Sequence, residues 1–88
     1  MKKLSLEELN EFHTRVVDNL KSNRLRAGQT MFNCLYETYS ELADAIRATN
    51  ADCFHSNSRI PLFLQEISEN KEELENSNWK TILQQIKQ

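Results

Sequence analysis

Near the start of the chain, apolar side chains recur at every third or fourth position, which is the spacing of one helical face and not of a strand. These residues are Leu6, Leu9, Phe12, Val16, Val17 and Leu20. Ser5 and Glu8 fit a capping box, in which each side chain accepts a hydrogen bond from the backbone amide of the other residue. The pattern predicts a helix from residue 6 to about Lys21, ended by the polar pair Ser22-Asn23.

A second helix is predicted from Leu25 to Tyr39, where the residues separate into two faces on a helical wheel. The apolar side holds Leu25, Gly28, Phe32, Leu35, Tyr36 and Tyr39, and the opposite side holds Arg26, Thr30, Asn33 and Glu37. Gly28 falls within the apolar side, although a glycine inside a helix costs about 1 kcal/mol relative to alanine. We therefore expect a neighbouring helix to approach the backbone closely at Gly28.

A third, shorter helix is predicted before a polar loop. Ser40 is expected to cap this helix, which runs from Glu41 to about Ala48 and directs Leu42 and Ile46 inward. The following residues, 49–57, form the most loop-like stretch of the chain.

A fourth helix is expected to start at a cap formed by Ser58, with Pro61 in the first turn, where its missing amide hydrogen costs nothing. Its apolar stripe consists of Ile60, Phe63, Leu64 and Ile67. Leu62 points away from that stripe, so the pattern does not predict whether its side chain is buried in the core or exposed.

The C-terminal part of the chain begins with a polar stretch in which residues 71–75 fit a helical turn. A last helix, capped by Ser77 or Asn78, then follows. Its apolar residues, spaced by three and four, are Trp79, Ile82, Leu83 and Ile86.

Together these elements predict an all-α fold in which residues 1–88 form a single domain, a compact irregular or orthogonal bundle of four to five short helices. The presence of only one Gly and one Pro supports helices over sheets, because tight turns consume these residues. The predicted core consists of Leu9, Phe12, Val16, Leu20, Phe32, Leu35, Tyr36, Leu42, Ile46, Phe54, Ile60, Phe63, Leu64, Ile67, Trp79, Ile82, Leu83 and Ile86.

Composition and charge narrow the classes of function. A chain that is 39% hydrophobic and 27% charged is typical of a globular protein. Its net charge of −2 disfavours duplex DNA as a partner, because such binding depends on Lys and Arg neutralising phosphates. No apolar run approaches the ~20 residues that cross a bilayer, and glutamates at positions 7, 8 and 11 interrupt any signal-peptide core. We expect a cytoplasmic protein that does not bind membranes.

The residues with the most reactive side chains are Cys34, Cys53, His13 and His55. Two cysteines are too few for a disulfide scaffold, and the spacing matches no zinc motif. The loop places Cys53 two residues from His55, so a metal or thiol site there stays an alternative. Because the segment supplies neither a fixed base nor an oxyanion donor, we predict no enzymatic activity, no cofactor and no metal. His13 fits either a pH-sensitive group or a partly buried structural histidine.

Two kinds of surface are candidates for contact with a partner. Polar residues at helical spacing form a possible recognition strip, with an ordinary solvated face as the alternative; they are Arg26, Gln29, Asn33 and Glu37. Leu62 and Trp79 are candidate apolar anchors, because exposed apolar clusters and tryptophans mark interfaces. For both anchors the alternative is core packing.

Residues 40–67 also suggest a degenerate helix-turn-helix, which keeps nucleic-acid binding as an alternative function. Two features disfavour it. The predicted connection, residues 49–57, is longer than the usual three or four residues. Only Arg59 and Gln65, near the ends of the second helix, could contact base edges.

Residues 24–64 resemble small proteins of unassigned function that bacterial and phage genomes encode. The residues that carry this resemblance are Arg26, Gly28, Gln29, Phe32, Asn33, Leu35, Leu42, Ala43, Ile46, Asp52, Phe54, Ile60, Pro61 and Phe63. The resemblance implies an origin in a phage or another mobile element and, by analogy, a role in blocking a host protein. It implies no site residue.

Capped amphipathic helices without a convergent catalytic set predict a small protein-interaction module, an inhibitor or adaptor whose partner is another protein. Homo-oligomerisation stays open, because a chain this short has little apolar area to bury on its own.

Overall fold

The computed structural model describes residues 3–22 and 25–86, with side chains described as far as residue 84. The elements are α1 (Leu6–Ser22), α2 (Ala27–Thr38), α3 (Ser40–Ile46), the 3₁₀ turn η1 (Asn57–Arg59), α4 (Ile60–Ile67), α5 (Lys71–Asn76) and α6 (Lys80–Ile86). The predicted all-α class is confirmed. The helical turn expected near residues 71–75 is a helix of its own, α5, so the described part of the chain has more helices than predicted.

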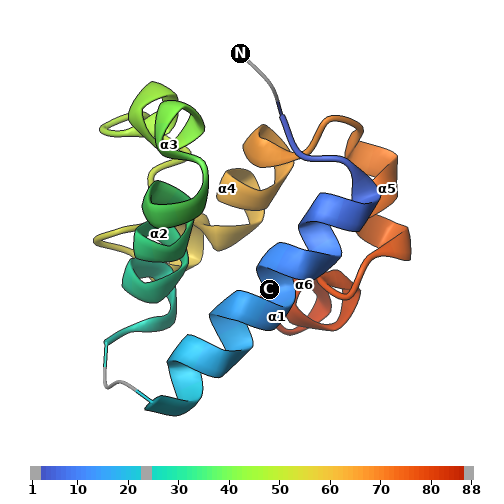
Figure 1. The fold of residues 1–88 in the computed structure, drawn as a ribbon, viewed down its shortest axis with the longest axis horizontal. Coiled ribbons are helices and arrows are strands. Elements are labelled where there is room, and N and C mark those ends of the chain that lie inside the picture. The colour runs from blue at the N-terminus through green and yellow to red at the C-terminus, as the bar shows by residue number, and fades with distance from the viewer. Residues whose placement is uncertain (1–2, 23–24, 87–88) are drawn as a thin grey trace.

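Figure 1 shows α1 running diagonally across the molecule, with α2 and α3 on one side of it and α5 and α6 on the other. α4 contacts α3, α5 and α6 and so connects the two groups. Three aromatic rings meet where these helices converge. The ring centroid of Phe12 lies 6.4 Å from that of Phe63 and 5.6 Å from that of Trp79, in tilted arrangements that aromatic pairs favour.

Most of the predicted core is confirmed. The fully buried members are Leu9, Phe12, Val16, Phe32, Leu35, Leu42, Ile46, Ile60, Phe63, Leu64, Ile67 and Trp79. Leu20, Phe54, Ile82 and Leu83 are partly buried and pack against this cluster. The predicted burial of Ile86 lies outside the described side chains.

The buried face of α2 differs from the predicted one. Tyr36, predicted to lie in the core, is 45% exposed, and Leu25, just before the helix, is 42% exposed. Thr30, assigned to the polar side, is 2% exposed, and Met31 and Cys34 are buried as well. The reason is that α2 contacts α1, α3 and η1, so protein covers more than one side of this helix. A wheel with a single apolar side cannot describe such a helix.

Two of the expected N-caps are wrong. Ser40 is the first residue of α3, whose N-cap is Tyr39 without a side-chain hydrogen bond. Only Tyr39 separates α2 from α3, so the chain re-enters helical geometry before Ser40 can act as a cap. Ser58 lies within η1, and α4 follows Arg59 without a side-chain cap. Here the 3₁₀ turn takes the place that the cap would fill.

Other helix-start signals are confirmed. In the capping box, the Ser5 amide donates to Glu8 Oε1 at 3.0 Å and the Glu8 amide donates to Ser5 Oγ at 3.3 Å. Pro61 lies in the first turn of α4.

A third expected cap, that at Ser77 or Asn78, is also wrong, because Ser77 ends α5 and α6 begins only at Lys80, directly after Trp79. The Ser77 hydroxyl accepts a hydrogen bond from the Trp79 amide at 3.1 Å in the turn between the two helices.

The segment before α1 is part of the core, which the sequence pattern did not indicate. Leu4 is 1% exposed. Its amide donates to the Ile67 carbonyl at 2.7 Å, and its carbonyl accepts from the Glu69 amide at 2.8 Å. These bonds tie the start of the chain to the junction between α4 and α5.

Candidate functional site

The loop between α3 and η1, residues 47–56, is held in one shape by Asp52. The Asp52 carboxylate accepts hydrogen bonds from the amides of Ala48 at 2.8 Å and Phe54 at 2.9 Å, so each of its oxygens is used within the loop. Ala48 has φ of 65°, a left-handed conformation that residues with a Cβ adopt at a cost. The Asp52 hydrogen bonds compensate for that cost and fix the turn.

Gly28 is the point where this loop approaches α2. A Cβ at Gly28 would overlap the backbone carbonyl oxygen of Cys53 and would lie 3.0 Å from Asn57 Oδ1. The Gly28 amide donates to Asn57 Oδ1 at 2.9 Å, and the Cys53 thiol donates to the Gly28 carbonyl at 3.3 Å. The predicted close approach is confirmed, but the neighbour is the loop and η1 and not a helix.

Arg26, the residue before α2, also holds this loop in place. Its guanidinium donates to the carbonyl oxygens of Phe54 at 3.0 Å and His55 at 2.8 Å. The sequence places Arg26 in a polar recognition strip, and the structure gives it a role in positioning the loop beside α2.

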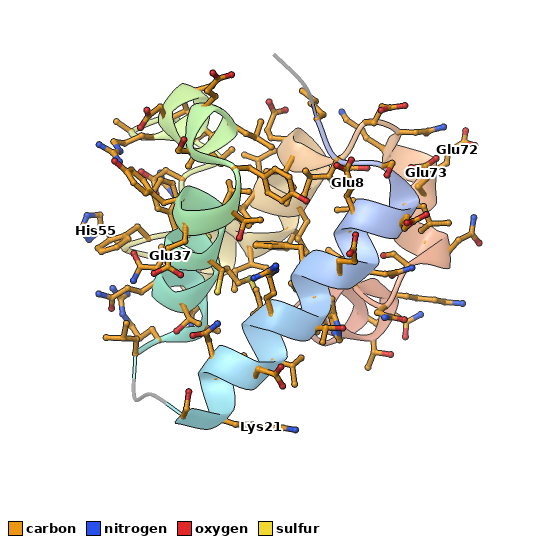
Figure 2. All side chains as sticks on the ribbon, in the orientation of Figure 1. Glu8, Lys21, Glu37, His55, Glu72 and Glu73 are labelled. Atoms are coloured by element: carbon orange, nitrogen blue, oxygen red, sulfur yellow. The ribbon has the colours of Figure 1, made fainter. Side chains whose placement is uncertain are left out.

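A cleft of about 460 Å³ opens between α2 and the loop, within the usual ~300–1,000 Å³ range of ligand pockets. The residues that line this cleft are Phe32, Asn33, Tyr36, Arg47, Asp52, Phe54 and His55. The rings of Phe32 and Phe54 meet edge to face, with centroids 6.0 Å apart, and those of Phe54 and His55 meet in the same way at 4.9 Å. Figure 2 shows His55 and Glu37 at the edge of the molecule where α2 and the loop lie.

Arg47 is the cation of this cleft. The guanidinium carbon of Arg47 lies 5.2 Å from the ring centroid of Tyr36, a cation–π contact. Arg47 also lies 3.4 Å from Asp44 Oδ1, but the two side chains are 53% and 61% exposed, so this ion pair contributes only about 0–1 kcal/mol. Arg47 therefore keeps donors for a further acceptor.

A second hollow, of about 290 Å³, continues from the cleft along the loop. The two share Asp52 and His55, and the second hollow ends at Arg59. The guanidinium of Arg59 lies 3.5 Å from the Thr49 carbonyl oxygen, across the loop. The cleft and this hollow, together called the depression, are adjacent at these shared residues; Arg47 lines the cleft and Arg59 lines the hollow.

The structure separates the other predicted contact residues. Asn33 lines the cleft, whereas Gln29 and Glu37 of the same strip do not. Leu62 is 39% exposed and lines a separate hollow of about 290 Å³ beside α3. Trp79 is fully buried and its indole N–H donates to the Leu9 carbonyl at 3.0 Å, so the core alternative holds for Trp79.

The Cys53 thiol is buried beneath the loop and lies outside the cleft. Burial, together with the charge of Asp52, raises the pKa of this thiol from 9.0 to about 12. Cys53 is therefore a neutral thiol at pH 7 and lacks the thiolate that a nucleophile or a metal ligand needs. Burial, and then the charge of Glu37, also raise the pKa of Cys34. Among the described residues, no three Cys, His, Asp or Glu side chains gather to hold a metal ion.

His13 is partly buried and packs against the core, as the structural alternative expects. Its ring meets Trp79 edge to face, with centroids 4.9 Å apart, and burial lowers its pKa. The imidazole is thus part of the packing around the buried indole.

The helix-turn-helix geometry is not formed by α3 and α4. Residues 47–59 separate the two helices, a longer connection than the predicted loop and much longer than the usual three or four residues.

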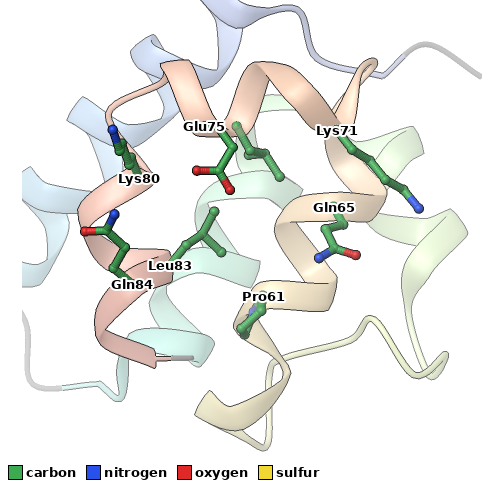
Figure 3. Close-up of a pocket in the computed structure, with 8 residues that line it drawn as sticks. Pro61, Gln65, Lys71, Glu75, Lys80, Leu83 and Gln84 are labelled. Atoms are coloured by element: carbon green, nitrogen blue, oxygen red, sulfur yellow. The ribbon is translucent and has the colours of Figure 1, made fainter. Parts of the chain in front are cut away.

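A separate cavity of about 210 Å³ lies among α4, α5 and α6, and its lining residues are Pro61, Gln65, Lys71, Leu74, Glu75, Lys80, Leu83 and Gln84. Figure 3 shows Lys71 and Lys80 on opposite sides of this cavity, with Glu75 between them. The cavity is smaller than the usual ~300 Å³ lower limit of ligand pockets, and charges of both signs surround it. The cleft beside α2 is the better candidate site.

Five residues of this cleft had no site role in the prediction from sequence, and two of them, Phe32 and Phe54, were expected only in the core. Tyr36 was expected in the core as well, and no site role was assigned to Arg47 or Asp52. An aspartate two residues before Phe54 in a polar loop is typical of an Asx turn, and this signal could have located the fixed point of the loop. No sequence signal places Arg47 over the ring of Tyr36.

None of the helices in the described ranges has the length and apolar character needed to cross a membrane. No family model, no curated protein and no solved structure matches the chain.

Proposed function

We propose that this protein is a small protein-interaction module that docks a partner protein through the cleft beside α2. The observation that carries the proposal is an aromatic cleft that faces solvent, walled by the exposed Tyr36 and the half-buried Phe54. Aromatic and arginine side chains are enriched at the energetic centres of protein interfaces, and the cleft combines both types. A partner that covered these rings would remove their exposed apolar surface from water, which favours binding.

The rigidity of the cleft also supports a binding role. The loop is held by Asp52 from within, by Arg26 from the N-terminus of α2, and by the contact at Gly28. A wall that is already ordered loses less conformational entropy on binding, so more of the contact energy is kept as affinity.

The function proposed is that of an inhibitor or adaptor that occupies a surface of another protein. The origin in a mobile element and the host protein as partner are proposed from the resemblance that the sequence suggests between residues 24–64 and small bacterial and phage-encoded proteins of unassigned function. A catalytic role for Cys53 is disfavoured by its burial and by the pKa of about 12 that this burial causes.

Site-specific photocrosslinking in the native host tests the proposal. Tyr36 is replaced by p-benzoylphenylalanine, which keeps an aromatic ring at the edge of the cleft. Gln84, an exposed residue of the α4–α6 cavity, is replaced in the same way as the control. We expect a crosslinked protein of defined mass from position 36 and none of that mass from position 84. Crosslinks from position 36 that match those from position 84, or none at all, would contradict the proposal.

A further inference from the structure

The side chains that line the depression along the loop offer hydrogen-bond donors and positive charge. Among the described residues that line it, the one carboxylate is that of Asp52, which already accepts hydrogen bonds from two backbone amides at 2.8 and 2.9 Å. Arg47 lines the cleft, Arg59 lines the hollow, and the exposed His55 lines both. The groups left to interact with a ligand are therefore chiefly donors, which suit carboxylates.

Carboxylates occur on both sides of the molecule. The first turns of α1 and α5 each carry two glutamates, among them Glu8, Glu72 and Glu73. Figure 2 shows Glu72 and Glu73 at the opposite edge of the molecule from His55, with Glu37 on the same side as His55. Because Glu37 lies on that side, the positive charge that a carboxylate would meet is local to Arg47 and Arg59.

The aromatic walls add a second requirement. Phe54 already packs edge-on against Phe32 and His55, while Tyr36 is 45% exposed. Such a surface is suited to another aromatic ring, since aromatic pairs favour edge-to-face and offset contacts. The Arg47 guanidinium over Tyr36 lies close enough to such a ring to bind a carboxylate beside it.

We propose that the cleft recognises an acidic peptide segment of the partner, in which an aromatic side chain enters between Tyr36 and Phe54 and flanking carboxylates bind Arg47 and Arg59. This inference rests on the proposed function and specifies the chemistry of the partner. Nucleic acid offers aromatic bases and negative charge as well. However, the chain carries a net charge of −2, and binding to a phosphate backbone depends on a concentrated basic field.

Titration of the ¹⁵N-labelled protein with defined probes tests the inference. The first probe is a pool of short peptides with a central Phe, Tyr or Trp flanked by Asp and Glu. In the second pool Lys replaces the acidic residues, and in the third Ala replaces the aromatic residue. The fourth probe is single-stranded oligothymidylate. We expect only the first pool to shift the amide signals of Asn33, Tyr36, Phe54 and His55.

Charge reversal locates the interaction. Arg47→Glu should weaken binding of the acidic pool by about tenfold or more. Lys80→Glu makes the same change of charge at the α4–α6 cavity and should leave the affinity unchanged. Circular dichroism of both variants establishes that they remain folded, which Arg47→Glu should do because Arg47 is exposed and its ion pair is weak.

The outcomes separate this inference from the proposed function. Equal binding of the acidic and basic pools, stronger binding of oligothymidylate, or no binding of any peptide at millimolar concentration overturns the inference. If photocrosslinking at position 36 still captures one partner, the proposed function stands although its acidic-peptide form fails. If both the crosslink and the titration fail, the proposed function fails as well.

Discussion

Replacing Gly28 by alanine sets two physical effects against each other. Within a helix, alanine is favoured over glycine by about 1 kcal/mol, so helix propensity alone predicts that Gly28→Ala stabilises the protein. The structure predicts the opposite, because the new Cβ would overlap the Cys53 carbonyl oxygen. That oxygen belongs to the backbone of a loop that Asp52 and Arg26 hold in place, so it cannot turn aside as a side chain would.

The magnitude follows from the two terms. Overpacking a well-filled interior costs about 1–3 kcal/mol, and contact with a fixed backbone atom puts this site near the upper end, about 3 kcal/mol. Subtracting the gain of about 1 kcal/mol in helix propensity leaves a net loss of about 2 kcal/mol. The Cys53–Gly28 and Gly28–Asn57 hydrogen bonds lie at the same contact and should weaken as the loop moves away.

Urea unfolding followed by far-ultraviolet circular dichroism measures this change. With a slope of about 1 kcal/mol per molar urea for a domain of this size, the midpoint should fall by about 2 M. Glu37→Ala serves as the control, because Glu37 is exposed on the same helix and should change stability by only about 0.5 kcal/mol. A Gly28→Ala variant as stable as the wild type, or more so, would refute the steric reasoning and show that the loop yields freely.

Three further predictions follow from other parts of the fold. Leu4→Ala should destabilise the protein by about 3 kcal/mol and lower Tm by about 15 °C in thermal unfolding, because Leu4 is 1% exposed in the core. Ala48→Gly should raise the free energy of unfolding by about 0.5 kcal/mol in urea titrations, because relief of the left-handed strain exceeds the added chain entropy of glycine. The pKa of Cys53 is higher in the folded chain, about 12, than the ordinary 9.0, so the folded state holds this proton over that interval. The contribution of Cys53 to the free energy of unfolding is therefore fully present below pH 9 and is lost progressively as the pH rises toward 12. Urea unfolding measured at several pH values in this range checks this prediction.

Each of these predictions has a control and a contradicting result. A stability loss below about 1 kcal/mol for Leu4→Ala would show that the N-terminal segment is not part of the folded core. Ala45→Gly, at an exposed helical position in α3, is the control and should destabilise the protein, whereas Ala48→Gly should not. A similar loss of stability in both variants would contradict the left-handed φ of Ala48. Cys53→Ala should show a smaller fall in stability above pH 9, and an unchanged fall would assign the effect to other groups.

The candidate site was only partly foreseeable from the sequence. Asn33 belongs to a polar strip that the helical spacing identifies, and it does line the cleft. Tyr36 was misplaced, because a wheel assigns an aromatic residue beside Leu35 to the buried side. Whether such a residue is covered depends on which helices flank it, and here α1, α3 and η1 leave it exposed to solvent.

The sequence by itself determined the local elements of this protein. Helical spacing of apolar residues, the Ser5–Glu8 capping box and Pro61 in a first turn act within a few residues, so they are readable without knowing what packs against them. Tertiary structure decided what depends on residues far apart in the chain: the burial of Leu4 against the α4–α5 junction, the exposure of Tyr36, and the cleft. The cleft exists because the loop and the first residue of η1, Asn57, pack against Gly28. These residues are far apart in the chain, so no local sequence pattern predicts their contact.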